Sequence, residues 1–505
     1  MAIARIRSFA FVGIEAISVD VEVQISAGLP SFAIVGLADK AVGEARERVR
    51  AALTTIGLAL PPKRILVNLA PADLLKEGSH FDLPIAVALL AAMAVVPLDS
   101  AMGFAALGEL SLDGRINAVT GVLPAAMAAS VAGLGLICPA AQGGEAAWAG
   151  RIAILAPGNL TELVSHFQGR QQLGVPEPAG VARPVSSADL SEVKGMETAR
   201  RGLEIAAAGG HNLLLVGPPG SGKSMLAARL PGLLPDLTPR EALEVSMVHS
   251  VAGMLEGGRL LQRPPYREPH HSASQAALIG GGRRGRPGEI SLAHRGVLFL
   301  DELPEFPRTT LEAMRQPLEA GRATVARAAI HVTYPARFQL IAAMNPCNCG
   351  QLADPARACA RAPRCGEEYA GRLSGPWLDR IDLTVSVQPL TPATLARAAP
   401  GEASAAVAAR VARARELQRE RWGALEAEGE TATTNAEIGG GRIQALLLPE
   451  ALDLLERASE RLHLSARGFT RILRVARTIA DLAGVVPVRR ADIAEALAFR
   501  MRLAG

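Results

Sequence analysis

The stretch Gly217-Pro-Pro-Gly-Ser-Gly-Lys-Ser224 follows the apolar run 213–216 and precedes the helix-forming run 225–230. A strand, a glycine-rich loop and a helix in this order form the Walker A pattern. The glycines let backbone N–H groups turn toward a phosphate, and the following helix presents its positive dipole end. Lys223 is expected to reach the β- and γ-phosphates and Ser224 to bind Mg²⁺. The expected nucleotide-binding residues are Gly217, Pro218, Pro219, Gly220, Ser221, Gly222, Lys223 and Ser224.

Two further apolar runs end in polar residues. Val297-Leu-Phe-Leu-Asp-Glu302 has the form of a Walker B strand. In that arrangement Asp301 completes the Mg²⁺ coordination and Glu302 orients the attacking water. The run 338–344 leads to Asn345, which suits a polar sensor of the γ-phosphate, although an Asn before a Pro is also a common turn former. Together with the Walker A stretch, these residues predict Mg²⁺-dependent nucleotide hydrolysis.

The composition sets limits on the class of protein. A chain of 505 residues is too long for one core and suggests about three domains. A net charge of +4 permits binding to nucleic acid, but 3% aromatic residues leave little surface for base stacking, so contacts would be mainly to phosphate. The longest apolar run, 83–98, is shorter than a bilayer span and contains two prolines, so a buried helix is expected here and no membrane partner.

Changes in composition along the chain predict four segments. Residues 1–168 alternate strand and helix patterns, and 169–187 form a linker rich in Pro, Gly and Gln. Residues 188–390 hold the nucleotide motifs and a cysteine-rich loop at 346–366. Residues 391–505 have helical spacing and are expected to form a separate helical domain.

The first segment resembles the proteolytic domain of Lon. The resemblance rests on 72–86 and on Gly108-Glu-Leu-Ser-Leu-Asp-Gly-Arg-Ile116. Members of that family use a Ser-Lys dyad, in which a lysine activates the serine. When the motifs are aligned, the serine position falls on His80 and the lysine position on Leu123, and no lysine occurs within 77–193. The segment is therefore expected to be a Lon-like scaffold without proteolytic activity.

Two arginines complete a resemblance to AAA+ ATPases. Arg380, within Gly375-Pro-Trp-Leu-Asp-Arg-Ile-Asp-Leu383, resembles the arginine finger that reaches the γ-phosphate of a neighbouring subunit. Arg467 resembles the sensor-2 arginine of the helical lid, with Arg471 and Arg474 as alternatives. Because such a finger acts between subunits, the resemblance implies a ring, most often of six copies.

The inserts narrow this resemblance. A long insert separates Walker A from Walker B, and 321–337 alternates like a β-hairpin. Both features resemble the magnesium-chelatase motor subunit and minichromosome-maintenance helicases. The YifB/ComM family of magnesium-chelatase-like proteins is matched by Pro269-His-His-Ser, Pro287-Gly-Glu-Ile-Ser-Leu-Ala-His294, Asp301-Glu-Leu-Pro-Glu-Phe306, Arg315-Gln-Pro-Leu-Glu319 and Met344-Asn-Pro-Cys347.

This resemblance implies both a fold and an activity. The implied fold is α/β: a Lon-like α/β domain, an AAA+ P-loop α/β domain with a helix-2 insert and a β-hairpin before sensor 1, and a C-terminal helical lid. The implied activity is that of a bacterial hexameric DNA motor driven by ATP and Mg²⁺, which in ComM serves branch migration during natural transformation. The alternative is a remodelling ATPase that acts on protein or metal-insertion partners.

Five arginines are candidates for contacts to DNA phosphate. Arg283, Arg284 and Arg286 lie on a glycine-rich loop, and Arg327 and Arg337 lie on the expected hairpin. Flexible cations suit a ring lumen that slides along phosphate without reading bases. The loop charges are equally compatible with a solvated loop that serves only solubility.

The cysteines favour a reducing compartment. Four of the five lie close together, and such spacing in a chain of this length does not resemble a secreted disulfide framework. The expected location is the cytoplasm. Cys347, Cys349, Cys359 and Cys365 offer four thiolates for a structural zinc ion, but their spacing departs from paired C-x-x-C motifs. Zinc binding and free thiols are therefore both open interpretations.

Overall fold

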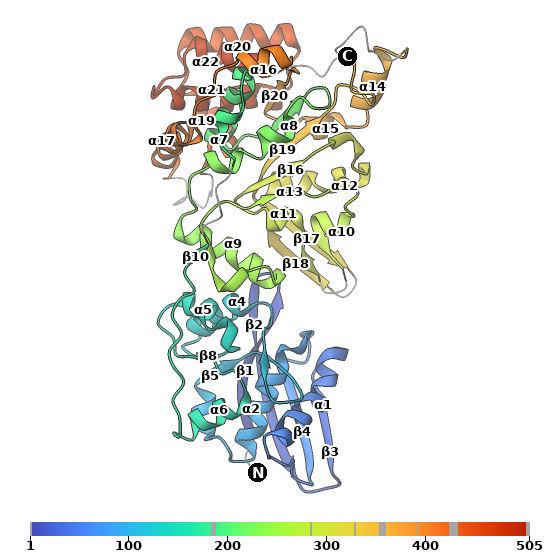
Figure 1. The fold of residues 1–505 in the computed structure, drawn as a ribbon, viewed down its shortest axis with the longest axis vertical. Coiled ribbons are helices and arrows are strands. Elements are labelled where there is room, and N and C mark those ends of the chain that lie inside the picture. Colours follow the sequence, from blue (N-terminus) through green and yellow to red (C-terminus); the bar gives the residue numbers. More distant parts are fainter. Residues whose placement is uncertain are drawn as a thin grey trace.

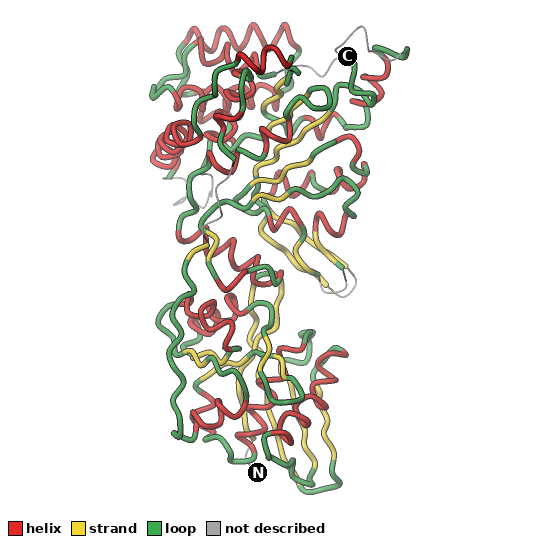
Figure 2. Tube along the Cα trace, in the orientation of Figure 1, coloured by secondary structure: helices red, strands yellow, loops and turns green. Residues whose placement is uncertain are grey.

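The computed structural model describes residues 3–182, 188–282, 285–327, 330–352, 360–389, 391–423 and 433–500. The molecule is elongated, with the N-terminal unit at one end and the P-loop unit and the C-terminal helices side by side at the other (Figure 1). Figure 2 shows two main groups of strands, one in each α/β unit. The mixed α/β class predicted from the sequence is confirmed.

The N-terminal unit is built on a mixed seven-stranded sheet with the order β3-β4-β2-β1-β5-β8-β9. β1 and β2 pair antiparallel from Ile3 opposite Gln24 to Val12 opposite Glu15. Alternation along β2 buries Val19, Val21 and Val23 on one face, as a period of two requires. The strands are β1 (Ile3–Val12), β2 (Glu15–Ser26), β3 (Ser31–Val35), β4 (Arg64–Ala70), β5 (Phe104–Ala106), β8 (Gly135–Ile137) and β9 (Ile154–Leu155), with the ribbon β6 (Glu109–Leu110) and β7 (Ile116–Asn117) beside them.

Helices cover this sheet, and the most apolar of them is buried. Residues 82–91 of α2 all lie in the interior, which confirms a buried helix in the long apolar run 83–98, but the helix ends at Ala92 and not near the end of the run. Among the described helices, none combines the length and apolar character needed to cross a bilayer. The helices of the unit are α1 (Lys40–Thr55), α2 (Asp82–Ala92), α3 (Leu98–Met102), α4 (Val122–Val131), α5 (Gly143–Ala146) and α6 (Leu160–Phe167).

The P-loop unit has a five-stranded sheet in which every pairing is parallel, with the order β13-β16-β19-β11-β20. Strands buried on both faces read as continuous apolar runs, as the sequence does at the Walker strands. The strands are β11 (Leu213–Val216), β13 (Tyr266–Arg267), β16 (Val297–Leu300), β19 (Gln339–Met344) and β20 (Leu383–Ser386). Because parallel strands end at the same edge, this topology brings the loop after β11 beside the residues that follow β16 and β19.

The hairpin insert also forms as predicted. β17 (Arg322–Arg327) and β18 (Ile330–Pro335) pair antiparallel, which confirms the β-hairpin. A short ribbon, β14 (Gly280–Gly281) with β15 (Arg286–Pro287), lies in the first insert. The helices of the unit are α7 (Glu197–Gly209), α8 (Lys223–Ala227), α9 (Pro239–Ala252), α10 (Gln275–Ile279), α11 (Glu289–Leu292), α12 (Arg308–Ala313), α13 (Arg315–Ala320), α14 (Arg364–Ala370) and α15 (Gly375–Leu378).

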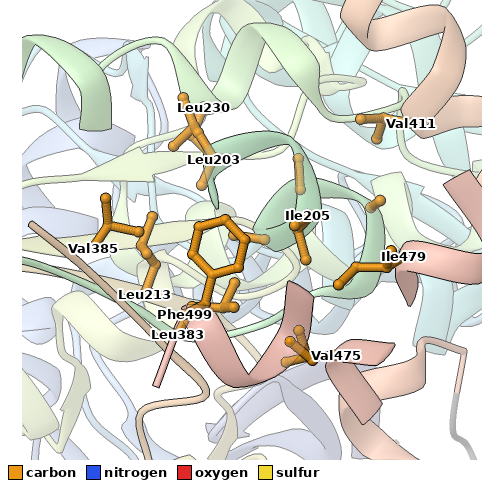
Figure 3. Packing of buried hydrophobic residues seen from close by; sticks show 14 of the residues in the cluster. Leu203, Ile205, Leu213, Leu230, Leu383, Val385, Val411, Val475, Ile479 and Phe499 are labelled. Atoms are coloured by element: carbon orange, nitrogen blue, oxygen red, sulfur yellow. The ribbon is translucent and has the colours of Figure 1, made fainter. Parts of the chain in front are cut away.

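The C-terminal residues are helical, and they share a core with the P-loop sheet. Leu203 of α7, Leu213 of β11 and Leu383 of β20 belong to the same buried cluster as Val475 and Phe499 (Figure 3). This common core fixes the helices against one face of the sheet. They are α16 (Pro392–Arg397), α17 (Ser404–Trp422), α19 (Gly440–Gln444), α20 (Pro449–Leu462), α21 (Ala466–Leu482) and α22 (Arg490–Ala498).

The N-terminal unit docks on the P-loop unit through α4 and α9. The Gly121 N–H donates to the Ser250 carbonyl at 3.1 Å. The Ser250 hydroxyl donates to the Glu145 carboxylate at 2.6 Å. The connecting segment adds β10 (Val181–Ala182), which pairs in parallel with β12 (Leu260–Leu261). These contacts tie the expected linker to the P-loop unit at its C-terminal end.

Candidate nucleotide site

The Walker A stretch forms an open phosphate loop between β11 and α8. Gly220 and Gly222 take φ values of +73° and +89°, which L side chains rarely adopt. A Cβ atom added to Gly220 would meet no atom within 4 Å, so the loop leaves space beside its backbone. The buried Ser221 hydroxyl has no hydrogen-bond partner among the described residues. An unpaired buried donor and free space beside the loop fit a phosphate group.

Lys223 lies inside this loop. Its ammonium group donates to the carbonyls of Gly217 at 2.8 Å and Pro218 at 2.9 Å. It also donates to the Asn345 side-chain oxygen at 3.1 Å. Burial lowers the pKa of Lys223, and the nearby carboxylates of Asp301 and Glu302 oppose that shift. The structure thus brings the predicted sensor and the Walker A lysine into direct contact.

The predicted Mg²⁺ ligands are also adjacent. The Ser224 hydroxyl donates to Asp301 Oδ2 at 2.6 Å, and the Glu302 N–H donates to Asp301 Oδ1 at 2.8 Å. A hydroxyl and a carboxylate are hard oxygen ligands of the kind that Mg²⁺ takes in nucleotide sites. Their separation allows both to face one ion. The donor set therefore fits the predicted metal.

Glu302 contacts a residue that the Walker B pattern does not indicate. Its backbone is in the left-handed region, with φ at +49°, which is uncommon for a residue other than glycine. Its carboxylate lies 3.2 Å from His271 Nδ1. His271 follows the short strand β13, which pairs with the Walker B strand β16. The signal available in the sequence was the histidine pair within the first insert, but only the sheet order places it beside the Glu302 carboxylate.

Arg380 and Arg467 lie around one carboxylate, that of Glu319. Arg380 forms an ion pair with Glu319 and donates to the Arg315 carbonyl at 3.3 Å. Burial lowers the pKa of Arg380. Arg467 lies 4.0 Å from the same Glu319 and keeps 63% of its side chain exposed. In the described part of the chain neither arginine contacts the phosphate loop through a hydrogen bond or an ion pair, so their proposed roles stay predictions.

The two alternatives to Arg467 are engaged in structural contacts. Arg471 is buried, donates to the Ile381 carbonyl at 3.1 Å and lies 3.2 Å from Asp379. Arg474 donates to the Ile438 carbonyl at 2.7 Å, and burial lowers its pKa. These contacts hold α21 to the neighbouring segments. Arg467 is the candidate with the most exposed side chain.

The candidate DNA arginines are only partly described. Arg283 and Arg284 lie outside the described residues, and of Arg327 only its backbone place at the end of β17 is described. Arg286 is exposed on the short ribbon of the first insert. Arg337 is half-buried and lies 4.0 Å from Glu437, so its charge faces a carboxylate of the helical part. Arg286 therefore remains the described candidate with a solvent-facing side chain.

Three of the predicted thiol ligands come together. The sulfur atoms of Cys347, Cys349 and Cys365 all lie within 4.8 Å of one another, and those of Cys347 and Cys349 are 3.1 Å apart. This cluster could hold a metal ion. Cys359 lies outside the described residues.

The positions that would hold a Lon-type dyad have other contacts. His80, at the serine position, is buried, and its Nε2 lies 2.9 Å from the Phe9 carbonyl oxygen. Burial lowers the pKa of His80 to about 4. Leu123, at the lysine position, is buried, and its backbone N–H donates to Glu145 at 3.0 Å. These two positions therefore carry no serine and lysine that could react together.

Three family models match successive parts of the chain. The model described as subunit ChlI of Mg-chelatase matches residues 21–142. The model described as magnesium chelatase, subunit ChlI, matches residues 189–395. The model of the ChlI C-terminal part matches residues 401–500. The matches therefore follow the N-terminal unit, the P-loop unit and the C-terminal helices in turn.

Similar proteins are related over almost their entire length. YifB of Salmonella typhimurium is 43% identical over 99% of this chain and 97% of its own, and YifB of Escherichia coli is 42% identical over the same shares. Competence protein ComM of Haemophilus influenzae is 42% identical over 99% of this chain and 98% of its own. The similarity therefore includes the N-terminal unit as well as the nucleotide site.

Proposed function

The chain belongs to the YifB/ComM family of magnesium-chelatase-like AAA+ proteins, and on this premise we propose that it is an ATP-driven, ring-shaped DNA motor. The observation that carries the ATPase part is the convergence of Lys223, Ser224, Asp301 and Asn345 at one edge of a parallel sheet. Ligands of α/β proteins bind at this edge, where strands end and loops meet. ATP and Mg²⁺ are the proposed nucleotide and metal.

Each residue of the site has a defined task in this proposal. Lys223 and the loop N–H groups bind the phosphates, and Ser224 with Asp301 holds the metal, which neutralises developing charge on the phosphate oxygens. Glu302 orients the attacking water once its carboxylate leaves His271. Asn345 hydrogen-bonds to the γ-phosphate in exchange for its contact with Lys223. All of these groups come from one chain.

The ring follows from the arginines. Arg380 supplies positive charge to the γ-phosphate held by a neighbouring copy, and Arg467 acts from the helical domain. For this role Arg380 has to exchange its contact with Glu319 for the phosphate of the neighbour. The proposed assembly is a homo-hexamer, in keeping with AAA+ rings. Each catalytic site is then complete only between two copies.

DNA is the proposed substrate of the motor. The name of the Haemophilus influenzae relative, competence protein ComM, supports a task in the uptake or recombination of DNA during natural transformation. The hairpin β17–β18 and Arg286 on the first insert are the proposed contacts to phosphate, for single-stranded or branched DNA. In this function the motor moves branch points as a helicase or translocase.

We place the protein in the cytoplasm, where cysteines stay reduced and a zinc ion can occupy the thiol cluster.

A remodelling ATPase that acts on protein or metal-insertion partners is the second candidate. The match to the magnesium-chelatase ChlI models favours it, because it covers the nucleotide site and the C-terminal helices alike. The N-terminal unit could then contact the partner protein. This candidate predicts that ATP hydrolysis does not depend on DNA.

The test measures ATP hydrolysis with and without forked DNA over a range of salt concentrations. The DNA motor requires stimulation that falls steeply as salt rises, since phosphate contacts release counterions. It also requires that labelled branched DNA be resolved in the presence of ATP. Lys223→Ala is the inactive control for both assays. If no DNA stimulates ATP hydrolysis at low salt, the DNA-motor proposal is wrong and the remodelling ATPase is the remaining candidate.

A further inference from the structure

The cluster of Cys347, Cys349 and Cys365 lies next to the nucleotide site. Cys347 follows Asn345 by two residues, and Cys365 lies in the first turn of α14. Cys347 and Cys365 are buried, and Cys349 is exposed. Thiolates at this mutual distance suit a thiophilic divalent ion, of which zinc is the commonest in reduced proteins.

The backbone already holds the cluster together. The Gly350 N–H donates to the Cys347 carbonyl at 2.9 Å, which closes a turn around Cys349. On the other side, a Cβ atom on Gly366 would lie 3.1 Å from the Pro346 carbonyl oxygen. The first turn of α14 therefore packs closely on the segment that carries the other two thiols. An ion bound here would cross-link α14 to that segment.

The same segment touches the phosphate loop at both of its ends. At one end, Asn345 accepts the hydrogen bond from Lys223. At the other end, Gly350 has φ at +75°, and a Cβ atom there would lie 2.4 Å from Cδ of Pro219. Only glycine permits this approach. The conformation of 345–350 is therefore coupled to that of the loop that binds phosphate.

We propose that Cys347, Cys349 and Cys365 bind a zinc ion that holds the segment 345–350 against the phosphate loop and thereby strengthens nucleotide binding. Three thiols release their protons when the ion binds, and no electron transfer is involved. The fourth position of the tetrahedron is left to a ligand beyond these three. The metal site itself is independent of the proposed DNA motor, whereas its coupling rests on the proposed nucleotide binding.

Linkage gives this proposal a quantitative form. If zinc raises the affinity for nucleotide by some factor, nucleotide must raise the affinity for zinc by the same factor. Coupling between two sites of one protein is usually about 5- to 150-fold. Cys138 offers a matched control, because it is a buried single thiol of the N-terminal unit whose pKa is raised by burial.

The experiment uses the full chain purified without chelators. Elemental analysis is expected to find about one zinc per chain, as for a structural thiolate site. Cys349→Ser and Cys365→Ser are expected to lose that zinc and to bind a fluorescent ATP analogue about 5- to 150-fold more weakly. Cys138→Ser is expected to keep both properties. ATP is expected to slow zinc release to a chromogenic chelator in the wild-type chain.

The variant Gly350→Ala distinguishes zinc binding from the effect of the zinc site on nucleotide affinity. This variant keeps all three thiols, so it is expected to retain zinc while its nucleotide affinity falls. A wild-type chain that binds nucleotide but contains no zinc overturns the proposal. Equal nucleotide affinity with and without zinc overturns the coupling. A zinc-loaded chain that binds no nucleotide contradicts the proposed ATPase instead, so the two failures are distinguishable.

Discussion

The N-terminal unit and the P-loop unit both resemble a known catalytic domain, but only one of them keeps the groups that the chemistry needs. In the P-loop unit, Lys223 lies 3.1 Å from Asn345, and Ser224 lies 2.6 Å from Asp301. In the N-terminal unit, the serine position is the buried His80. The difference shows that a fold-level resemblance transfers an activity only where the reacting side chains are also present and adjacent.

The N-terminal unit uses the corresponding region for docking instead. The N–H of Leu123, at the lysine position, donates to Glu145, and Glu145 in turn accepts from Ser250 of the P-loop unit. Burial raises the pKa of Glu145. The region that would hold the catalytic base of a protease thus contacts α9. We therefore expect substitutions in the two units to have different kinds of effect, on chemistry in one and on unit contacts in the other.

The largest effect is expected for Lys223→Ala. The lysine is the cation of the phosphate loop, and removal of one partner of a buried charge pair costs about 2–5 kcal/mol. Nucleotide binding should therefore fall below detection at ordinary ATP concentrations, and hydrolysis should disappear with it. Titration with a fluorescent ATP analogue measures this. Lys40→Ala is the matched control, since Lys40 in the N-terminal unit keeps 93% of its side chain exposed. If Lys223→Ala binds the ATP analogue with wild-type affinity, the nucleotide does not bind at this loop.

Arg380→Ala should keep nucleotide binding and lose hydrolysis. An arginine finger contributes about 10³–10⁵ to kcat, and it does so between subunits. Single-turnover ATP hydrolysis measures the loss, and the same nucleotide titration confirms that binding survives. Mixtures of Lys223→Ala and Arg380→Ala chains should regain activity, because a mixed pair contains one intact composite site. Mixtures that stay inactive at every ratio would contradict sharing between copies.

Ser250→Ala should act on the contact between the two units and spare the chemistry. It leaves the buried Glu145 without one of its donors, a loss of about 1–3 kcal/mol. Hydrogen exchange of the Gly121 and Leu123 amides should accelerate by about 5- to 150-fold if local opening governs it. Ser8→Ala is the control, since the buried Ser8 hydroxyl has no hydrogen-bond partner among the described residues. Unchanged exchange in Ser250→Ala would remove the docking role of Glu145.

Local sequence patterns predicted much of this molecule. The Walker strands, the hairpin and the buried start of the long apolar run could be recognised because each depends on residues close together in sequence. The sequence also named Lys223 and Asn345 as phosphate-binding candidates, but their direct contact was found only in the structure, where the parallel strands β11 and β19 end at one edge. The pairing of Glu302 with His271 could not be predicted, since it depends on the order of β13 and β16 in the sheet.

The shared contact of Arg380 and Arg467 with Glu319 could not be predicted for the same reason. Arg380 and Arg467 are far apart in sequence, and Glu319 lies far from both. Only the packing of α13, α15 and the start of α21 gathers the three charges. The partial burial of Arg337 could not be predicted from the sequence either. Its place beside the hairpin suggested an exposed cation, but its side chain faces Glu437. Sequence patterns thus pointed to candidate catalytic residues but not to the carboxylates that pair with them.

At neutral pH the smallest effect is expected for the titration of His80, and it distinguishes a structural histidine from a catalytic one. A general base would work best with a pKa near the operating pH. Burial lowers the pKa of His80 from 6.5 to about 4, so the folded chain keeps this ring neutral at neutral pH. Above pH 6.5 the ring is neutral in both folded and unfolded chains and makes no difference to stability.

As the pH falls from 6.5 toward 4, the unfolded chain binds a proton at this position and the folded chain does not. The free energy of unfolding should therefore fall across this window because of His80. His80→Gln cannot titrate, so the difference in unfolding free energy between the wild type and the variant should be constant above pH 6.5 and should shift in favour of the variant below it. Chemical denaturation at a series of pH values measures this difference, and the ring protons of His80 report the titration by NMR. A ring that titrates near pH 7 would show that His80 is open to solvent and would bring the N-terminal unit back among candidate catalytic sites.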